Sequence, residues 1–102
     1  MSYRIRFTAE AEADLIRLYD LILDRDIADW SVADRALQAI KAGLRTLELT
    51  PFTCRKAEGG SPFLRELLIP FGAAGYVALF EIDNAETITG LALRHQRESD
   101  YH

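Results

Sequence analysis

The sequence predicts an α+β domain in which an antiparallel sheet packs on an α-helical hairpin, with the element order β-α-α-β-β-β. A short alternating segment opens the chain, two amphipathic helical patterns follow it, and three short apolar runs fill the second half. The chain has 102 residues, of which 49% are hydrophobic and 27% are charged, enough for one hydrophobic core. We therefore expect residues 1–102 to form a single domain.

A strand and then a helix are predicted at the start of the chain. Tyr3, Ile5 and Phe7 alternate with arginines, which is typical of a half-buried strand. Thr8 is placed to cap a helix whose first turn is acidic, as the helix dipole favours. The residues expected to form the buried stripe of this helix are Ala11, Leu15, Leu18, Tyr19 and Ile22.

Two more apolar residues, Ile16 and Leu23, widen the apolar surface of this helix. They form either a second surface that contacts a partner or an extension of the surface that packs on the core. The sequence leaves both interpretations open.

A second helix is expected after an acidic turn at residues 24–30. Ser31 can cap it, and Asp34 three positions later gives a weak capping-box pattern. Gly43 in its interior predicts a close helix crossing, and Pro51 ends it. The expected buried stripe is Ala33, Leu37, Ile40, Leu44 and Leu47. The short turn predicts that the two helices form an antiparallel hairpin.

Three apolar runs predict an antiparallel meander after a loop at residues 52–62. The runs are residues 63–69, 75–82 and 87–93. The segments between them have lengths suited to hairpins. The middle run is almost wholly apolar, so we expect it to be the central strand.

Charge and cysteine content narrow the class of protein. The net charge is -4 and the pI is about 5.1, which argues against a general nucleic-acid-binding protein. Cys54 is the only cysteine and fits a reducing compartment. No apolar run approaches the roughly 20 residues that span a bilayer, and the first residues lack a secretory pattern. We expect a cytoplasmic protein without a membrane segment.

A metal or cofactor site is not expected from the sequence. His95 and His102 are the only histidines, and no cysteine lies near them at ligand spacing. A glycine-rich phosphate-binding loop is also missing from the sequence.

Ionisable side chains gather after the last predicted strand. Arg94 and Arg97 can bind phosphate or carboxylate, and His95 can transfer a proton near neutral pH. Tyr101 can donate or accept a hydrogen bond. A solvated, charged tail explains the same composition, so composition alone does not make this run a functional site.

A second basic group comprises Arg55 and Lys56 in the loop and Arg65 in the next strand. Arg65 either faces solvent or forms a cross-strand pair of modest strength beside Glu66. It contributes to a common site with Arg94 only if the sheet brings the two residues together. The sequence does not give the register that decides this.

Three segments, in this order and spacing, carry a resemblance to a known family. They are residues 63–67, 75–80 and 93–98. Together with the order of elements, they resemble the RelE/ParE toxin superfamily of bacterial type II toxin–antitoxin systems. The resemblance covers nearly the whole chain, and the ending from Arg94 to Tyr101 is most similar to the ParE branch.

The resemblance to the ParE branch implies a growth-inhibiting toxin that a cognate antitoxin binds and neutralises in a hetero-oligomeric complex. The usual target of this branch is DNA gyrase, which is inhibited by binding and not by catalysis. On this interpretation Arg94, Arg97 and Tyr101 contact the target, and Ile16 and Leu23 contact the antitoxin.

The RelE branch implies an alternative, a ribosome-dependent endoribonuclease that cuts mRNA. Its reaction requires groups that activate a 2′-hydroxyl, stabilise the phosphorane and protonate the leaving oxygen. The residues available for this site are Arg65, Arg94, His95 and Tyr101. The central run at residues 76–82 has no basic residue where many relatives carry an arginine, and the chain is acidic. We therefore favour a gyrase inhibitor that is not an enzyme.

Overall fold

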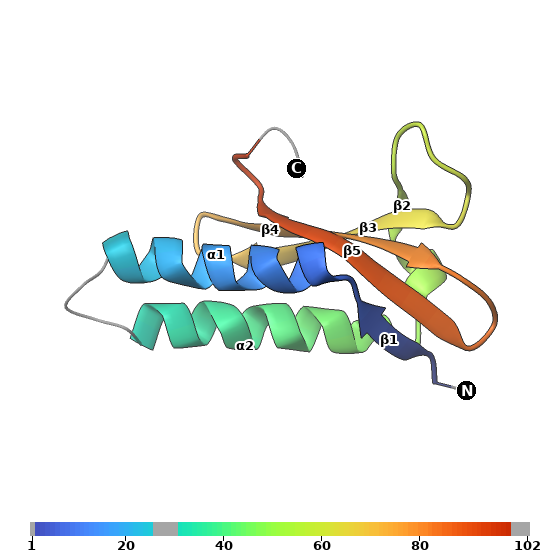
Figure 1. Cartoon of the computed structure of the whole chain (residues 1–102), viewed down its shortest axis with the longest axis horizontal. Coiled ribbons are helices and arrows are strands. Elements are labelled where there is room, and N and C mark those ends of the chain that lie inside the picture. The colour runs from blue at the N-terminus through green and yellow to red at the C-terminus, as the bar shows by residue number, and fades with distance from the viewer. Residues whose placement is uncertain (1, 26–30, 99–102) are drawn as a thin grey trace.

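The computed structural model describes residues 2–25 and 31–98, which contain two α-helices and five strands (Figure 1). In chain order the elements are β1 Arg4–Phe7, α1 Ala9–Arg25, α2 Ser31–Thr46, the 3₁₀ helix η1 Pro51–Thr53, β2 Arg55–Lys56, β3 Leu64–Phe71, β4 Ala74–Ile82 and β5 Thr87–His95. The predicted order β-α-α-β-β-β is confirmed, with β2 as an addition. Of the acidic turn expected at residues 24–30, the first two residues belong to α1 and the others lie outside the described residues.

All five strands form one sheet in the order β1-β5-β4-β3-β2. β3, β4 and β5 make the predicted antiparallel meander, and β4 is the central and most buried strand. β1, however, lies beside β5 and runs parallel to it, so the prediction of an antiparallel sheet is wrong at this edge. Alternating side chains predict a strand but not its direction, because both kinds of pairing have the same period of two.

The short strand β2 was not predicted. Arg55 pairs with Glu66 and Lys56 with Arg65, which places β2 at the edge of the sheet beside β3. Two charged residues show no apolar alternation, so the sequence carries no local signal for this strand.

Both helices lie side by side on the same face of the sheet, as predicted for a hairpin (Figure 1). α1 packs mainly on β5 and α2 mainly on β3. The Tyr19 hydroxyl on α1 donates a hydrogen bond of 3.0 Å to Asp34 Oδ1 on α2. This bond to the carboxylate raises the pKa of Tyr19 above its ordinary value. Neither described helix is long and apolar enough to cross a membrane.

Gly43 allows α2 to approach the sheet closely. A Cβ atom at this position would lie 2.9 Å from Ile69 Cγ1 on β3. The close approach is therefore made with β3 and not with the other helix, so the predicted helix crossing is wrong. An interior glycine indicates a near neighbour but not which element provides it.

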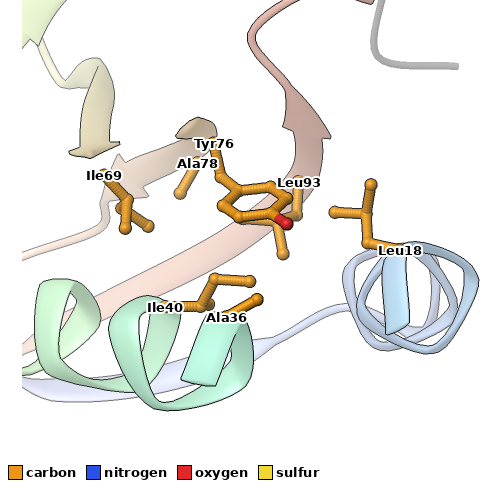
Figure 2. Packing of buried hydrophobic residues seen from close by; sticks show 7 residues of the cluster. All are labelled: Leu18, Ala36, Ile40, Ile69, Tyr76, Ala78 and Leu93. Carbon is orange, nitrogen blue, oxygen red and sulfur yellow. The ribbon is translucent and has the colours of Figure 1, made fainter. Parts of the chain in front are cut away.

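The buried core forms two clusters between the helices and the sheet. The first contains Leu18, Ala36, Ile40, Ile69, Tyr76, Ala78 and Leu93 (Figure 2). The second contains Leu47, Phe80, Ile82 and Ile88. Most of these residues come from the predicted helical stripes and apolar runs, so the core follows the periodicity of the sequence.

The start of α1 is tied directly to the outer edge of β5. Thr8 caps the helix as predicted, because its Oγ1 accepts the Ala11 N–H at 3.1 Å. The Thr8 N–H donates to Gly90 O at 3.0 Å, and its hydroxyl donates to Leu91 O at 3.1 Å. β1 pairs with β5 only as far as Gly90, so α1 takes over from the point where β1 ends.

Asp14 continues this connection nearly two turns further along α1. It is 5% exposed, and its Oδ2 accepts the Leu93 N–H at 2.9 Å. The Asp14 carboxylate thus supplies the hydrogen-bond acceptor that a neighbouring strand would otherwise provide for β5 at this position.

We predict that Asp14→Ala lowers the free energy of unfolding by about 1–3 kcal/mol, because the Leu93 N–H loses its buried acceptor. Urea denaturation measures the loss. The matched control is Asp20→Ala, an exposed aspartate of the same helix, which should change stability by less than about 0.5 kcal/mol. Equal effects of the two substitutions would show that the bond to Leu93 contributes nothing specific.

Candidate functional site: the end of β5 and its neighbours

The turn that follows β5 is held by Arg94. Its Nη1 donates to the carbonyl oxygens of His95, Gln96 and Glu98 at 3.2, 3.4 and 2.7 Å. Arginine suits this role because its guanidinium presents several donors in a fixed plane. Arg94 is half-buried, and its first function in the fold is to shape this turn.

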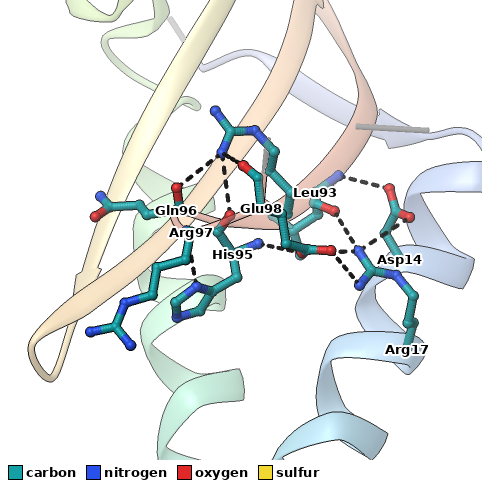
Figure 3. Close-up of polar contacts among 8 residues, drawn as sticks. Asp14, Arg17, Leu93, His95, Gln96, Arg97 and Glu98 are labelled. Atoms are coloured by element: carbon teal, nitrogen blue, oxygen red, sulfur yellow. Dashed lines mark hydrogen bonds and ion pairs between the residues drawn. The ribbon is translucent and has the colours of Figure 1, made fainter. Parts of the chain in front are cut away.

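Glu98 closes the turn against α1. Its carboxylate accepts Arg17 Nη1 at 3.0 Å and Nη2 at 3.3 Å, and it also accepts the His95 N–H at 2.9 Å (Figure 3). Arg17 Nη2 lies 3.5 Å from Leu93 O, so the same guanidinium also reaches the edge of β5. Arg17 and Glu98 are 81 positions apart, and no local pattern in the sequence pairs them.

The pKa of Glu98 reflects these contacts. Partial burial raises it, but the hydrogen bonds from the His95 N–H and from Arg17 oppose this effect and prevail. The net result is a pKa below the ordinary value of a glutamate.

His95 and Arg97 stand on the outer side of the turn. His95 Nδ1 accepts the Arg97 N–H at 3.1 Å, and the His95 ring meets the Tyr76 ring edge-on with 5.5 Å between the centroids. Arg97 is exposed, and its guanidinium has no hydrogen-bond or ion-pair partner within the described part of the chain. Arg97 is therefore the arginine of this run that is displayed to solvent.

A hollow of about 440 Å³ lies beside this turn. Its apolar lining includes Leu18, Leu21 and Tyr76, while His95, Arg97 and Glu98 provide polar groups. α1, the first turn of α2, the β3–β4 turn and the end of β5 all contribute to its walls. A mainly apolar hollow that also contains an exposed arginine has a composition common at protein-binding surfaces.

Arg65 lies in a different environment, where it holds the loop that leads into β3. Its Nε donates to Pro62 O at 2.7 Å, and its Nη1 donates to Phe52 O and Cys54 O at 3.1 and 2.8 Å. The guanidinium also lies over the Phe52 ring, 5.3 Å from the centroid. Arg65 was expected to face solvent or to form a cross-strand pair, but its guanidinium instead donates to carbonyl oxygens of the loop.

The sheet does not bring Arg65 and Arg94 together. Arg65 pairs with Phe80, a core residue that faces the helices, whereas Arg94 pairs with Val77. Successive residues of β4 point to opposite faces, so the two arginines project from opposite faces of the sheet. Tyr101, the remaining residue of the predicted C-terminal run, lies outside the described residues.

The two residues expected to contact an antitoxin lie on one side of α1. Ile16 and Leu23 are two turns apart, which places them on the same helix face. Ile16 is 64% exposed and Leu23 is half-buried. Their neighbours Leu15 and Ile22 pack on the core instead, so Ile16 does not belong to the core-facing stripe.

The described residues contain no group of three or more histidine, cysteine or acidic side chains arranged to hold a metal ion. Burial raises the pKa of the Cys54 thiol, and the nearby Arg65 offsets this only in part. A thiol with a raised pKa is a poor nucleophile near neutral pH.

Comparison with known proteins identifies the family. The family model described as the ParE toxin of the type II toxin-antitoxin system, parDE, matches residues 5–100. The chain belongs to the ParE toxin family. The predicted resemblance to the ParE branch is confirmed, and the chain is a toxin-family member of the type II class.

A solved structure of this kind shares the fold of this ParE-family chain. That structure, described as "Chromosomal ParDE TA system from P. aeruginosa", superposes with a TM-score of 0.69 at 20% sequence identity. The match covers 92% of this chain and 96% of that chain. A comparison with curated proteins gave no match.

We predict that Glu98→Gln lowers the free energy of unfolding at pH 7 by up to about 1 kcal/mol, because a half-exposed ion pair with Arg17 is lost. The folded-state pKa of Glu98 lies below its unfolded-state value, so its contribution is complete above the ordinary glutamate range. The contribution disappears as the pH falls through the folded-state pKa.

The measurement is urea denaturation of both proteins at pH 7 and at about pH 3. The difference between them should shrink in acid. Glu58→Gln, at an exposed loop residue, is the control and should show no such pH dependence. A difference that stays constant between the two pH values would contradict the prediction.

Proposed function

We propose that this chain is a growth-inhibiting toxin that acts by binding DNA gyrase and that a cognate antitoxin neutralises in a hetero-oligomeric complex. Membership of the ParE toxin family supports the toxin assignment. The observation that carries the binding mode is the separation of Arg65 and Arg94 on opposite faces of the sheet. A cytoplasmic location follows from the proposed target.

Cleavage of RNA would require a base, a cation and an acid gathered around one phosphate. Within residues 2–25 and 31–98, Arg65 is bonded to loop carbonyls and Arg94 to the carbonyls of the C-terminal turn. Arg65 therefore stabilises the loop before β3, and Arg94 stabilises the turn after β5. This arrangement supports inhibition by binding over RNA cleavage.

The proposed target-binding surface is the displayed Arg97 with the hollow beside it, and Tyr101 remains part of the proposal from sequence. Arginine and large apolar side chains are the residues that contribute most to protein interfaces. Arg94 stays in the proposal as the residue that fixes the turn presenting Arg97. Its substitution would change both the turn and the surface, so Arg97 gives the sharper test.

We predict that the purified protein inhibits supercoiling by gyrase and does not cleave mRNA on programmed ribosomes. Arg97→Ala should weaken the inhibition about tenfold or more, because an interface arginine is lost while the bonds that hold the turn remain. The matched control is Arg4→Ala, an exposed arginine whose strand partner is Thr87 at the opposite end of β5. Unfolding curves of both variants show whether the fold is kept.

Two results would change these assignments. Codon-dependent cleavage of mRNA together with intact supercoiling would replace gyrase inhibition by endoribonuclease activity. If Arg97→Ala inhibits gyrase as strongly as the wild type, Arg97 belongs to a solvated tail that does not contact the target.

The proposed antitoxin surface contains Ile16 and Leu23. Burial of an exposed isoleucine in an interface contributes about 1.5–3 kcal/mol. We predict that Ile16→Ser lowers the affinity for the antitoxin about tenfold or more, with little change in stability, because Ile16 is already 64% exposed.

The affinity is measured by calorimetry with the product of the adjacent reading frame, which we expect to be a short protein with a DNA-binding and an amphipathic part. Ala13→Ser, at an exposed position of the same helix, is the control. If both variants bind like the wild type, Ile16 lies outside the interface.

A further inference from the structure

A hollow is lined by residues from both clusters of the core. Its volume is about 190 Å³, and it lies between α1, α2 and the middle of the sheet. Ile40 and Leu93 from the first cluster line it, and so do Leu47 and Phe80 from the second. Leu44 and Leu67 pack against both clusters, so the hollow is a local gap in a connected core.

Small residues explain why this space is not filled. α1 packs mainly on β5 and α2 mainly on β3, so the hollow lies above β4 between the two helices. Ala11 on α1, Ala78 on β4 and Gly90 on β5 all line it. Phe7 occupies the space that a side chain at position 90 would need, since a Cβ there would lie 2.6 Å from Phe7 Cδ1. Phe7 also lines the hollow and is 44% exposed.

The lining surface of the hollow is apolar. Glu12 and Lys41 are the only charged residues among those that line it, and both are exposed to solvent. A buried water needs two to four polar partners, which these walls do not offer. A charged ligand would lose its hydration without gaining a partner inside.

We propose that this hollow is a binding site for a small, uncharged, apolar molecule in the size range of benzene to toluene. The hollow is partly open to solvent, but a space of this size between helices and sheet is unusual because protein interiors are normally close-packed. An engineered cavity of about 150 Å³ with a comparable aliphatic and aromatic lining stays dry and binds benzene or xenon. The site is separate from the proposed gyrase-binding and antitoxin-binding surfaces, so it does not depend on the proposed function.

The test is a titration of the purified full chain with toluene, followed by thermal unfolding and by methyl NMR. At about ten times the Kd, Tm should rise by roughly 5–10 °C, because toluene binds the folded state only. Saturable shifts of the Ala11 and Ala78 methyl signals should accompany this rise. No saturable rise in Tm, or shifts confined to other methyl groups, would overturn the proposal.

Two filling substitutions, Ala11→Leu and Ala78→Val, locate the effect. Each should abolish or strongly reduce the toluene-induced rise in Tm, because the added methyl groups occupy the hollow. The control Ala13→Leu adds the same side chain at an exposed position of α1 and should leave the rise unchanged. If one filled variant fails to fold, the other still decides, together with the wild-type methyl shifts. A rise in Tm equal to that of the wild type in a folded, filled variant would overturn the site.

Discussion

The fold is organised around the outer edge of β5. A strand edge presents backbone N–H and C=O groups that need partners. β1 supplies them only as far as Gly90, and Thr8 and Asp14 of the next segment bond the following positions. Arg17 and Glu98 then complete the same edge. The outer edge of β5 is thus bonded in turn by β1, by Thr8 at the start of α1, by the Asp14 carboxylate, and by Arg17 and Glu98.

This connection fixes how α1 is rotated on the sheet. With Asp14 and Leu18 held inward, Ile16 must point away from the core. The Tyr19–Asp34 hydrogen bond then aligns α2 beside α1. The exposed apolar face of α1 and the hollow beneath the helices are both consequences of this placement.

The contacts at this edge also explain the roles of the charged residues that follow β5. Arg94 and Glu98 are engaged in shaping the turn after β5, so their role is architectural first. Arg97 is left on the outside of a turn that these bonds hold in place. Such a turn suits recognition of another macromolecule, because a side chain presented from a braced backbone loses less freedom on binding.

Local patterns were enough to predict the two helices, the meander, the central position of β4 and the Thr8 cap, because periodicity and turn chemistry act over a few residues. The family was predicted from the resemblance of three spaced segments. The parallel direction of β1, the edge strand β2 and the contact of Gly43 with Ile69 could be seen only in the folded chain. The same holds for the pairing of Arg17 with Glu98, 81 positions away, and for the opposite faces taken by Arg65 and Arg94. These features depend on strand register and long-range packing, which a local pattern does not encode.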